Sequence, residues 1–305
     1  MKPRIILAGG SGFVGHALCP VLLARGYEVI VLTRATSHDS GGVRFVQWNG
    51  KTVGDWTRFL DGAAAVVNLT GRSINCRHTS ENRREIIKSR VNSVQALGEA
   101  IAQSAQPPTA FVQAAGIGIY GDAGDRWCDE DAPHGSDFVT EVCELWERAF
   151  TDIIAIGTRK VLLRLGVVLG PNGGFLQILK KLTRAFLGGQ IGDGKQFISW
   201  IHIADLSQMF ASAIENAEIA GVFNATSPNP VTNAQFMREL RHALHRPWSP
   251  PVPKFAASIG SLIMGTEASL ALTSQRGVPK HFLEKGFKFD FPELRPALNN
   301  LLKNS

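Results

Sequence analysis

Short apolar runs alternate with longer amphipathic segments over the first half of the chain. The runs predict strands at residues 4–8, 28–33, 43–47, 64–68, 110–114 and 160–168. The amphipathic segments predict helices at residues 13–25, 81–104 and 137–156. Strands that are apolar at nearly every position are buried on both faces, and strands that alternate with helices are typical of parallel sheets. The pattern therefore predicts an α/β fold whose parallel sheet is covered by helices on both sides.

The second half is less regular. It predicts a helix near residues 175–187, a strand-like run at 197–203 leading into a helix at 204–216, and a helix at 233–244. The proline-rich segment 247–253 excludes a regular helix or a central strand. A small helical tail at 255–277 and a mixed final segment at 283–302 with a short terminal helix complete the predicted elements.

A glycine-rich turn joins the first predicted strand to the first predicted helix. It reads Gly9-Gly10-Ser11-Gly12-Phe13-Val14-Gly15, with glycines at every third position. Gly9 permits a tight turn, Gly12 leaves room for a pyrophosphate, and Gly15 allows close packing of helix on strand. In this strand–turn–helix context the motif predicts dinucleotide binding by a Rossmann-type doubly wound parallel sheet, with the pyrophosphate at the helix N-terminus.

The end of the second predicted strand indicates which dinucleotide is bound. An acidic residue there would bond the ribose 2′-hydroxyl of NAD, but Thr33 occupies this position and Arg34 follows. A guanidinium can pair with a 2′-phosphate, so the sequence favours NADP(H), the alternative being that Arg34 is a solvated loop residue.

Composition narrows the class of protein. The 305 residues have a net charge of +6 and contain four cysteines. The cysteines lack zinc-site spacing, so we expect no metal site, and a reducing, cytoplasmic location is the simplest expectation. No run is long enough for a membrane helix, and we find no nucleic-acid-binding module, so neither a membrane nor a nucleic acid is an expected partner. The sequence leaves monomer and homodimer open.

Several further motifs resemble those of extended short-chain dehydrogenases/reductases. Asn68-Leu69-Thr70-Gly71 resembles an Asn-x-Ala-Gly segment of that superfamily, and Ile119-Tyr120-Gly121 resembles its Tyr-Gly segment. The stretches 164–171, 199–206, 223–228 and 286–289 are similar to the atypical epimerase-family subgroup, some of whose members carry a SulA-like cell-division label. The resemblance covers nearly the whole chain. It implies the following cofactor-binding residues: Gly9, Ser11, Gly12, Phe13, Val14, Gly15, Thr33, Arg34, Leu69, Thr70 and Gly71.

The resemblance also implies two parts. Residues 1–170, with a later contribution from about 197–228, form the dinucleotide-binding domain. Residues 171–305 form a smaller, mixed C-terminal part that closes a substrate cleft.

The residues that do the chemistry in active members of the superfamily are missing. Those members use a Tyr-x-x-x-Lys pair, in which the tyrosine moves a proton and the lysine lowers its pKa. Val139 and Cys143 stand in those places here, and Ala114-Ala115-Gly116 replaces the usual serine stretch. Tyr120 is the remaining candidate for the catalytic acid, against its interpretation as a loop anchor.

Three residues are candidates for the substrate cleft. Arg90, on a helix where extended members often carry an asparagine facing the site, could hold a phosphate or carboxylate. Cys143 could be a reactive thiol or a small core residue. His202 belongs to a segment that in the family holds the two parts together more often than it does chemistry. Glu144 and Glu147 are interpreted as a solvated helix face.

Two functions remain open from sequence. The first is an NADP-dependent oxidoreductase or epimerase with a non-standard active site, acting on an unidentified small molecule such as a nucleotide sugar. The second is a catalytically weak dinucleotide-binding regulator or redox sensor, which the cell-division label of some relatives would suit.

Overall fold

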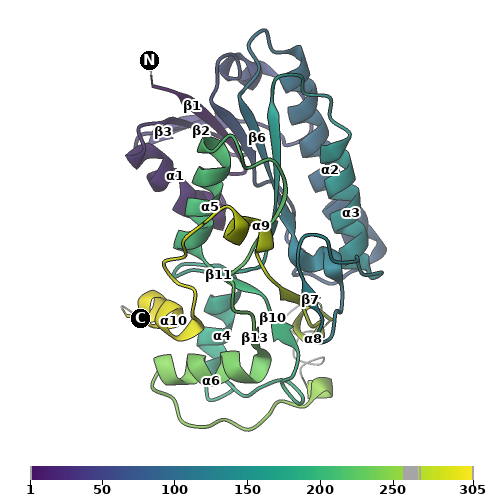
Figure 1. The fold of residues 1–305 in the computed structure, drawn as a ribbon, viewed down its shortest axis with the longest axis vertical. Coiled ribbons are helices and arrows are strands. Elements are labelled where there is room, and N and C mark those ends of the chain that lie inside the picture. Colours follow the sequence, from purple (N-terminus) through teal and green to yellow (C-terminus); the bar gives the residue numbers. More distant parts are fainter. Residues whose placement is uncertain (1, 257–266, 268, 304–305) are drawn as a thin grey trace.

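The computed structural model describes residues 2–256, 267 and 269–303. Its main sheet has eight strands in the order β12-β8-β6-β5-β1-β2-β4-β3 (Figure 1). All neighbouring strands are parallel except β3, which pairs antiparallel with β4 at one edge. The prediction of a doubly wound parallel sheet is confirmed. The strands are β1 (Arg4–Ala8), β2 (Glu28–Thr33), β3 (His38–Ser40), β4 (Val43–Gln47), β5 (Ala65–Asn68), β6 (Ala110–Gly116), β8 (Arg159–Leu165) and β12 (Gly221–Ala225).

Helices cover both faces of this sheet (Figure 1). On one side lie α1 (Phe13–Ala24) and α5 (Ile203–Glu215), and on the other α2 (Ser80–Gln103) and α3 (Phe138–Thr151). Along β1, Ile5 and Leu7 belong to the core cluster on the α1/α5 side, while Ile6 and Ala8 belong to the cluster on the α2/α3 side. Successive side chains of a strand point to opposite faces, which explains why these strands are apolar at every position.

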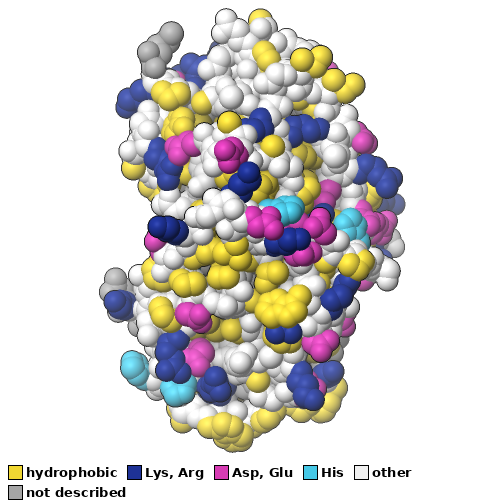
Figure 2. All heavy atoms as spheres, viewed as in Figure 1, with side chains coloured by type: hydrophobic (Ala, Val, Ile, Leu, Met, Phe, Trp, Pro, Cys, Tyr) yellow, Lys and Arg dark blue, Asp and Glu magenta, His cyan; other side chains and the backbone are white. Residues whose placement is uncertain are grey.

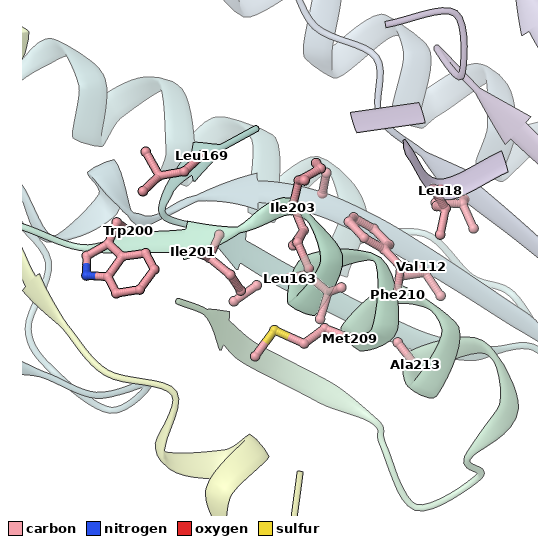
Figure 3. Close-up of a cluster of buried hydrophobic side chains, with 14 of the residues drawn as sticks. Leu18, Val112, Leu163, Leu169, Trp200, Ile201, Ile203, Met209, Phe210 and Ala213 are labelled. Atoms are coloured by element: carbon pink, nitrogen blue, oxygen red, sulfur yellow. The ribbon is translucent and has the colours of Figure 1, made fainter. Parts of the chain in front are cut away.

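The core on the α1/α5 side extends beyond the sheet into the C-terminal part. Figure 3 shows Leu18 of α1 and Phe210 of α5 on the same cluster as Val112 and Leu163 of the strands, with Trp200 farther along. Full burial of a Leu, Ile or Phe side chain contributes about 1.5–3 kcal/mol. This cluster is therefore one hydrophobic core that continues from the sheet to the C-terminal elements.

The C-terminal elements gather below the carboxyl ends of the strands (Figure 1). Three two-stranded sheets pair β9 with β11, β10 with β13, and β7 with β14.

No described helix is long and apolar enough to cross a membrane. The remaining strands are β7 (Trp127–Cys128), β9 (Val167–Leu169), β10 (Phe197–Ile198), β11 (Trp200–His202), β13 (Val231–Thr232) and β14 (Arg276–Gly277). The remaining helices are α4 (Gly174–Arg184), α6 (Asn233–Ala243), α8 (Ser269–Leu272), α9 (Lys280–Glu284) and α10 (Leu294–Leu302), and the 3₁₀ helices are η1 (Asp55–Phe59) and η2 (Ile117–Tyr120).

The predicted single strand at 160–168 is two strands. Gly166 separates them, because its N–H bonds to Ala225 of β12 whereas the N–H of Val167 bonds to Ser199 beside β11. A Cβ on Gly166 would lie 2.7 Å from the Ser199 carbonyl oxygen, so this crossing requires glycine. The chain passes here from the main sheet to the C-terminal part.

Two helix predictions were too long. The helix predicted to reach residue 156 ends at Thr151, because the Lys160 ammonium bonds to the carbonyls of Phe150, Thr151 and Ile153 and so stabilises the helix end. Much of the tail predicted as helical at 255–277 lies outside the described residues. In its described part residues 255–256 and α8 are helical, as predicted, whereas Arg276–Gly277 forms strand β14 against β7.

Candidate functional site

The glycine turn leaves backbone N–H groups free at the start of α1. Gly12 precedes the helix without a capping side chain, and the first turn contains no acidic residue. A Cβ on Gly15 would lie 2.2 Å from the Gly10 carbonyl oxygen, so helix and turn meet at a distance that only glycine allows. Free N–H groups and the positive end of the helix dipole together favour an anion such as a pyrophosphate.

The predicted cofactor residues converge from three neighbouring strands. A Cβ on Gly9 would lie 3.0 Å from the backbone of Leu69 and Thr70, which follow β5. Ser11 Oγ lies 3.2 Å from the Oγ1 of Thr33, the last residue of β2. The Arg34 side chain is exposed and makes no hydrogen bond or ion pair with any residue that the structure describes. The carboxyl ends of β1, β2 and β5 thus form one continuous surface.

Phe13 packs away from this surface. A Cβ on Gly170 or Gly173 would lie 2.6–2.7 Å from its ring, and Gly174 adjoins it as well. Val14 is half-buried against the α1/α5 core cluster. These two side chains therefore join α1 to its surroundings.

A buried polar network supports the turn after β5. Asn68 donates to Gln113 Oε1 at 2.9 Å and accepts from the Thr70 N–H at 3.0 Å. The Thr70 hydroxyl lies 2.6 Å from Ser93 Oγ on α2. Every member is buried or half-buried, so the network fixes the backbone of residues 69–71 beside Gly9.

The segment after β6 faces hydrocarbon and a thiol where active relatives carry Tyr and Lys. A Cβ on Gly118 would lie 2.5 Å from Val139 Cγ1, and one on Gly116 would lie 3.4 Å from Cys143 Sγ. Val139 and Cys143 of α3 therefore do face η2, as the alignment to the family implies. Val139 carries no ionisable proton, and burial raises the pKa of the Cys143 thiol to about 12, which makes it a weak general acid.

Tyr120, the last residue of η2, lies in a buried hydrogen-bond network with Asn224 and Arg164. Its side chain is 1% exposed, and its hydroxyl donates to Asn224 Oδ1 and accepts from Arg164 Nη1, both at 2.9 Å. Burial raises the pKa of Tyr120 to about 12 against the opposing effect of Arg164 and Asn224. With both hydrogen-bonding directions occupied, this geometry argues against the predicted role as a catalytic acid and matches the loop-anchor interpretation.

The interpretation of Glu147 as part of a solvated face was wrong. Its carboxylate is 12% exposed and accepts two bonds of 2.9 Å from Arg164, which also donates to the Glu130 carbonyl. Burial lowers the pKa of Arg164, but the hydrogen bonds and the negative charge of Glu147 outweigh it. The pKa of Arg164 is therefore above its ordinary value. An arginine within the apolar run of β8 was the sequence signal for such a buried partner.

His202 ties β11 to the C-terminal segment around Phe291. Its Nδ1 accepts from the Ala204 N–H at 3.0 Å, and its ring stacks on Phe291 at 3.9 Å. Burial lowers the pKa of His202 to about 4, so the ring is neutral at pH 7. Nearby, the Asp205 carboxylate accepts from the N–H groups of Asp290 and Phe291. These contacts support the alternative that His202 is a structural tie, and its place in the cleft stays a prediction.

We expect Cys143 to be unreactive in the folded protein. Burial, chiefly, and the charge of Glu147 raise the pKa of its thiol to about 12, so the reactive thiolate is scarce at pH 8. Cys76 is partly exposed. Iodoacetamide followed by peptide mass spectrometry should label Cys76 first and Cys143 only in denaturant, and Cys76→Ser should remove most native labelling. Labelling of native Cys143 at the rate of Cys76 would contradict this.

A metal cluster and a surface hollow are the other kinds of binding site that the described residues could offer. No group of three or more His, Cys, Asp or Glu side chains there could hold a metal ion. A surface hollow of about 600 Å³ is lined by residues such as Asp55, Arg58 and Gln103. It lies near the amino ends of β5 and β6, whereas the glycine turn lies at the carboxyl end of β1.

Comparison with known proteins identifies the family. Residues 5–225 match the model of the NAD dependent epimerase/dehydratase family. The chain belongs to this family. Residues 252–301 match a second model, a domain of unknown function called DUF1731. The predicted membership of an extended dehydrogenase/reductase group is therefore confirmed.

Relatives in this epimerase family match over nearly the full chain. The epimerase family protein YfhF of Bacillus subtilis is 35% identical over 301 residues, covering 98% of each chain. The structure of human SDR39U1 isoform 2 with NADPH is 33% identical with a TM-score of 0.88, covering 99% of this chain and 100% of that one. A structure described as the nucleoside-diphosphate sugar epimerase of Corynebacterium glutamicum is 34% identical with a TM-score of 0.79, covering 99% of this chain and 58% of that one.

Proposed function

We infer that this chain binds NADP(H) across the carboxyl ends of β1, β2 and β5. The observation that carries the proposal is the glycine turn with its free helix N-terminus beside Thr33 and Arg34. The similar human protein was solved with NADPH, which supports the same choice of cofactor. Arg34 would pair with the 2′-phosphate, the turn would hold the pyrophosphate, and residues 69–71 would line the site. The cofactor would supply or accept a hydride when bound.

NADP(H) should bind more tightly than NAD(H), and Arg34→Ala should remove the difference. Loss of one charge-assisted contact costs about 1.5–3 kcal/mol, roughly tenfold or more in affinity. Fluorescence titration of both cofactors against wild type and Arg34→Ala measures this. Arg44→Ala, which removes another exposed arginine, should change neither affinity. Equal affinity of the wild type for both cofactors would contradict the assignment.

We propose that the reaction class is oxidoreduction of a small substrate at a site without the family's usual proton donor. Val139 and Cys143 face η2, and the Tyr120 hydroxyl is fully engaged. The same observation favours a second candidate, a regulator that binds the dinucleotide without efficient catalysis. Measured turnover separates the two.

Little or no turnover is expected on nucleotide-diphosphate sugars. Loss of a positioned general acid or base removes about 10²–10⁴-fold in rate. Oxidation of NADPH and reduction of NADP should be screened against sugar nucleotides and small carbonyl compounds, with wild type and Tyr120→Phe. Turnover that disappears in folded Tyr120→Phe would restore Tyr120 as the acid. Robust turnover in both wild type and Tyr120→Phe would contradict the expected inactivity. No turnover in either protein would favour the regulator over the enzyme.

A further inference from the structure

Arg90 of α2 is a buried cation without a counter-ion. Its side chain belongs to a residue that is 8% exposed, and no carboxylate of the described residues pairs with it. On the face shown in Figure 2, exposed Lys and Arg are interspersed with Asp and Glu. Burial lowers the pKa of Arg90 to about 10. A guanidinium still carries its charge at neutral pH under these conditions, so the molecule maintains an uncompensated positive charge at this point.

The hydrogen bonds of Arg90 leave one edge of its guanidinium free. Nη1 donates to the carbonyls of Arg72 and Ile86 at 2.9 and 3.0 Å. Nε is buried without a partner, and Nη2 has none among the described residues. Nε and Nη2 form the side-on fork with which arginine binds a carboxylate through two parallel bonds. The two nitrogens that lack acceptors are therefore the pair that suits an oxyanion.

The surroundings of the Arg90 guanidinium hold it in a fixed position. The guanidinium lies over the Trp146 ring, 4.8 Å from its centroid, and Trp146 Nε1 is also buried without an acceptor. A Cβ on Gly71 would lie 3.2–3.5 Å from Cζ, Nη2 and Nε. Gly71 itself is exposed and ends the segment that adjoins the glycine turn. A side chain at this position would crowd the guanidinium, whereas glycine leaves room beside it.

We propose that Arg90 binds the carboxylate of the substrate, so that the substrate class is small carbonyl or hydroxyl compounds bearing a carboxylate. This inference rests on the proposed function, because it treats the ligand beside residues 69–71 as the partner of NADP(H). A carboxylate carries the single negative charge that one guanidinium neutralises. A phosphate would bring a second charge into a buried site where the described hydrogen bonds of Arg90 involve no other cationic side chain, since Arg72 contributes only its backbone carbonyl.

Oxamate tests the inference, because it is a small carboxylate that resembles a 2-oxo acid but is not reduced by NADPH. Oxamide is its neutral isostere, and inorganic phosphate is the competing oxyanion. Each is titrated calorimetrically into wild type, Arg90→Gln, Arg90→Lys and Arg72→Gln, with and without NADPH. Arg72→Gln is the matched control, because its exposed side chain bonds Asn82 while its backbone carbonyl still accepts from Arg90.

We expect NADPH-loaded wild type and Arg72→Gln to bind oxamate alike, and to prefer it to oxamide and phosphate. Arg90→Gln should weaken oxamate on the order of 10–100-fold while NADPH affinity stays within about threefold. Arg90→Lys keeps the charge but not the fork, so its oxamate affinity should lie between those of wild type and Arg90→Gln. If Arg90→Gln does not fold, Arg90→Lys serves as the test variant.

Any of the following results would overturn the proposal: no oxamate binding to wild type, equal binding of oxamate and oxamide, tighter binding of phosphate than of oxamate, or unchanged oxamate affinity in Arg90→Gln. A loss of NADPH affinity in Arg90→Gln equal to the loss of oxamate affinity would assign Arg90 to the cofactor and also overturn it. Failure of the proposed function is seen separately, as an absence of NADPH binding to wild type. Arg90-dependent binding of oxamate without cofactor would leave the carboxylate site standing in that case.

Discussion

Gly12→Val should abolish dinucleotide binding in a protein that remains folded. Gly12 is exposed at the start of α1, and a Cβ there would meet only the Gly9 carbonyl oxygen, at 3.3 Å. The fold can therefore accept a side chain with a small local shift, but its branches would occupy the space of the pyrophosphate. We expect NADPH affinity to fall by at least about 100-fold, or about 2.7 kcal/mol or more. Calorimetric titration beside circular dichroism measures both effects.

Gly54→Ala is the matched control for this experiment. Gly54 has an extended φ of −172°, and a Cβ there would make ordinary contact with Trp56 at 3.7 Å. It lies outside the glycine turn, so its replacement should leave NADPH affinity unchanged. Unaltered affinity in folded Gly12→Val would show that the turn does not hold the pyrophosphate.

Glu147→Gln should cause a large loss of stability. The substitution keeps the shape of the side chain but leaves the buried Arg164 without its counter-ion. Removing one partner of a buried, hydrogen-bonded pair costs about 3–5 kcal/mol. Urea unfolding followed by circular dichroism should show the loss as a lower midpoint. Glu28→Gln breaks the more exposed pair with Arg4, whose side chains are 36% and 27% exposed, and should cost no more than about 1 kcal/mol.

A double variant sharpens the test of this pair. Arg164→Met combined with Glu147→Gln removes both charges, so it should be more stable than the sum of the two single losses implies. Strictly additive losses, or equal effects of Glu147→Gln and Glu28→Gln, would contradict the assignment of a strongly coupled buried pair.

The parts of the fold that sequence predicts best are those decided by local pattern. Residues 4–8, 28–33 and 43–47 are apolar runs between turn signals, and the strands β1, β2 and β4 have these bounds. Strand β12 escaped prediction because Asn224 interrupts its apolar pattern. Asn224 is fully buried there, since its side chain bonds Tyr120, Cys128 and Val278. Such satisfaction of a polar group depends on residues distant in the chain.

The candidate site divides in the same way. The glycine turn has a local signature, so its spacing together with the strand before it and the helix after it predicts a dinucleotide site at residues 9–15. Arg90 and Tyr120 look alike in sequence as polar residues near the predicted site. What separates them is the number of acceptors and donors around each: Tyr120 has both directions filled, whereas Arg90 keeps an unpartnered Nε. Glu147 was misjudged because its partner Arg164 is 17 residues away on another element.

Strand β12 lies far after β8 in the sequence, and this affects folding during synthesis. Strand β8 pairs with β6 on one side and with β12 on the other, and β12 lies at residues 221–225. A ribosome that has released only the first 170 residues, or a fragment cut there, would present β8 as an open edge with Val161, Leu162 and Leu163 along it. Long apolar edges recruit other strands. We therefore expect a 1–170 fragment to aggregate and a fragment ending after β12 to be more soluble. During synthesis, the edge of β8 stays unpaired until residues 221–225 have been made.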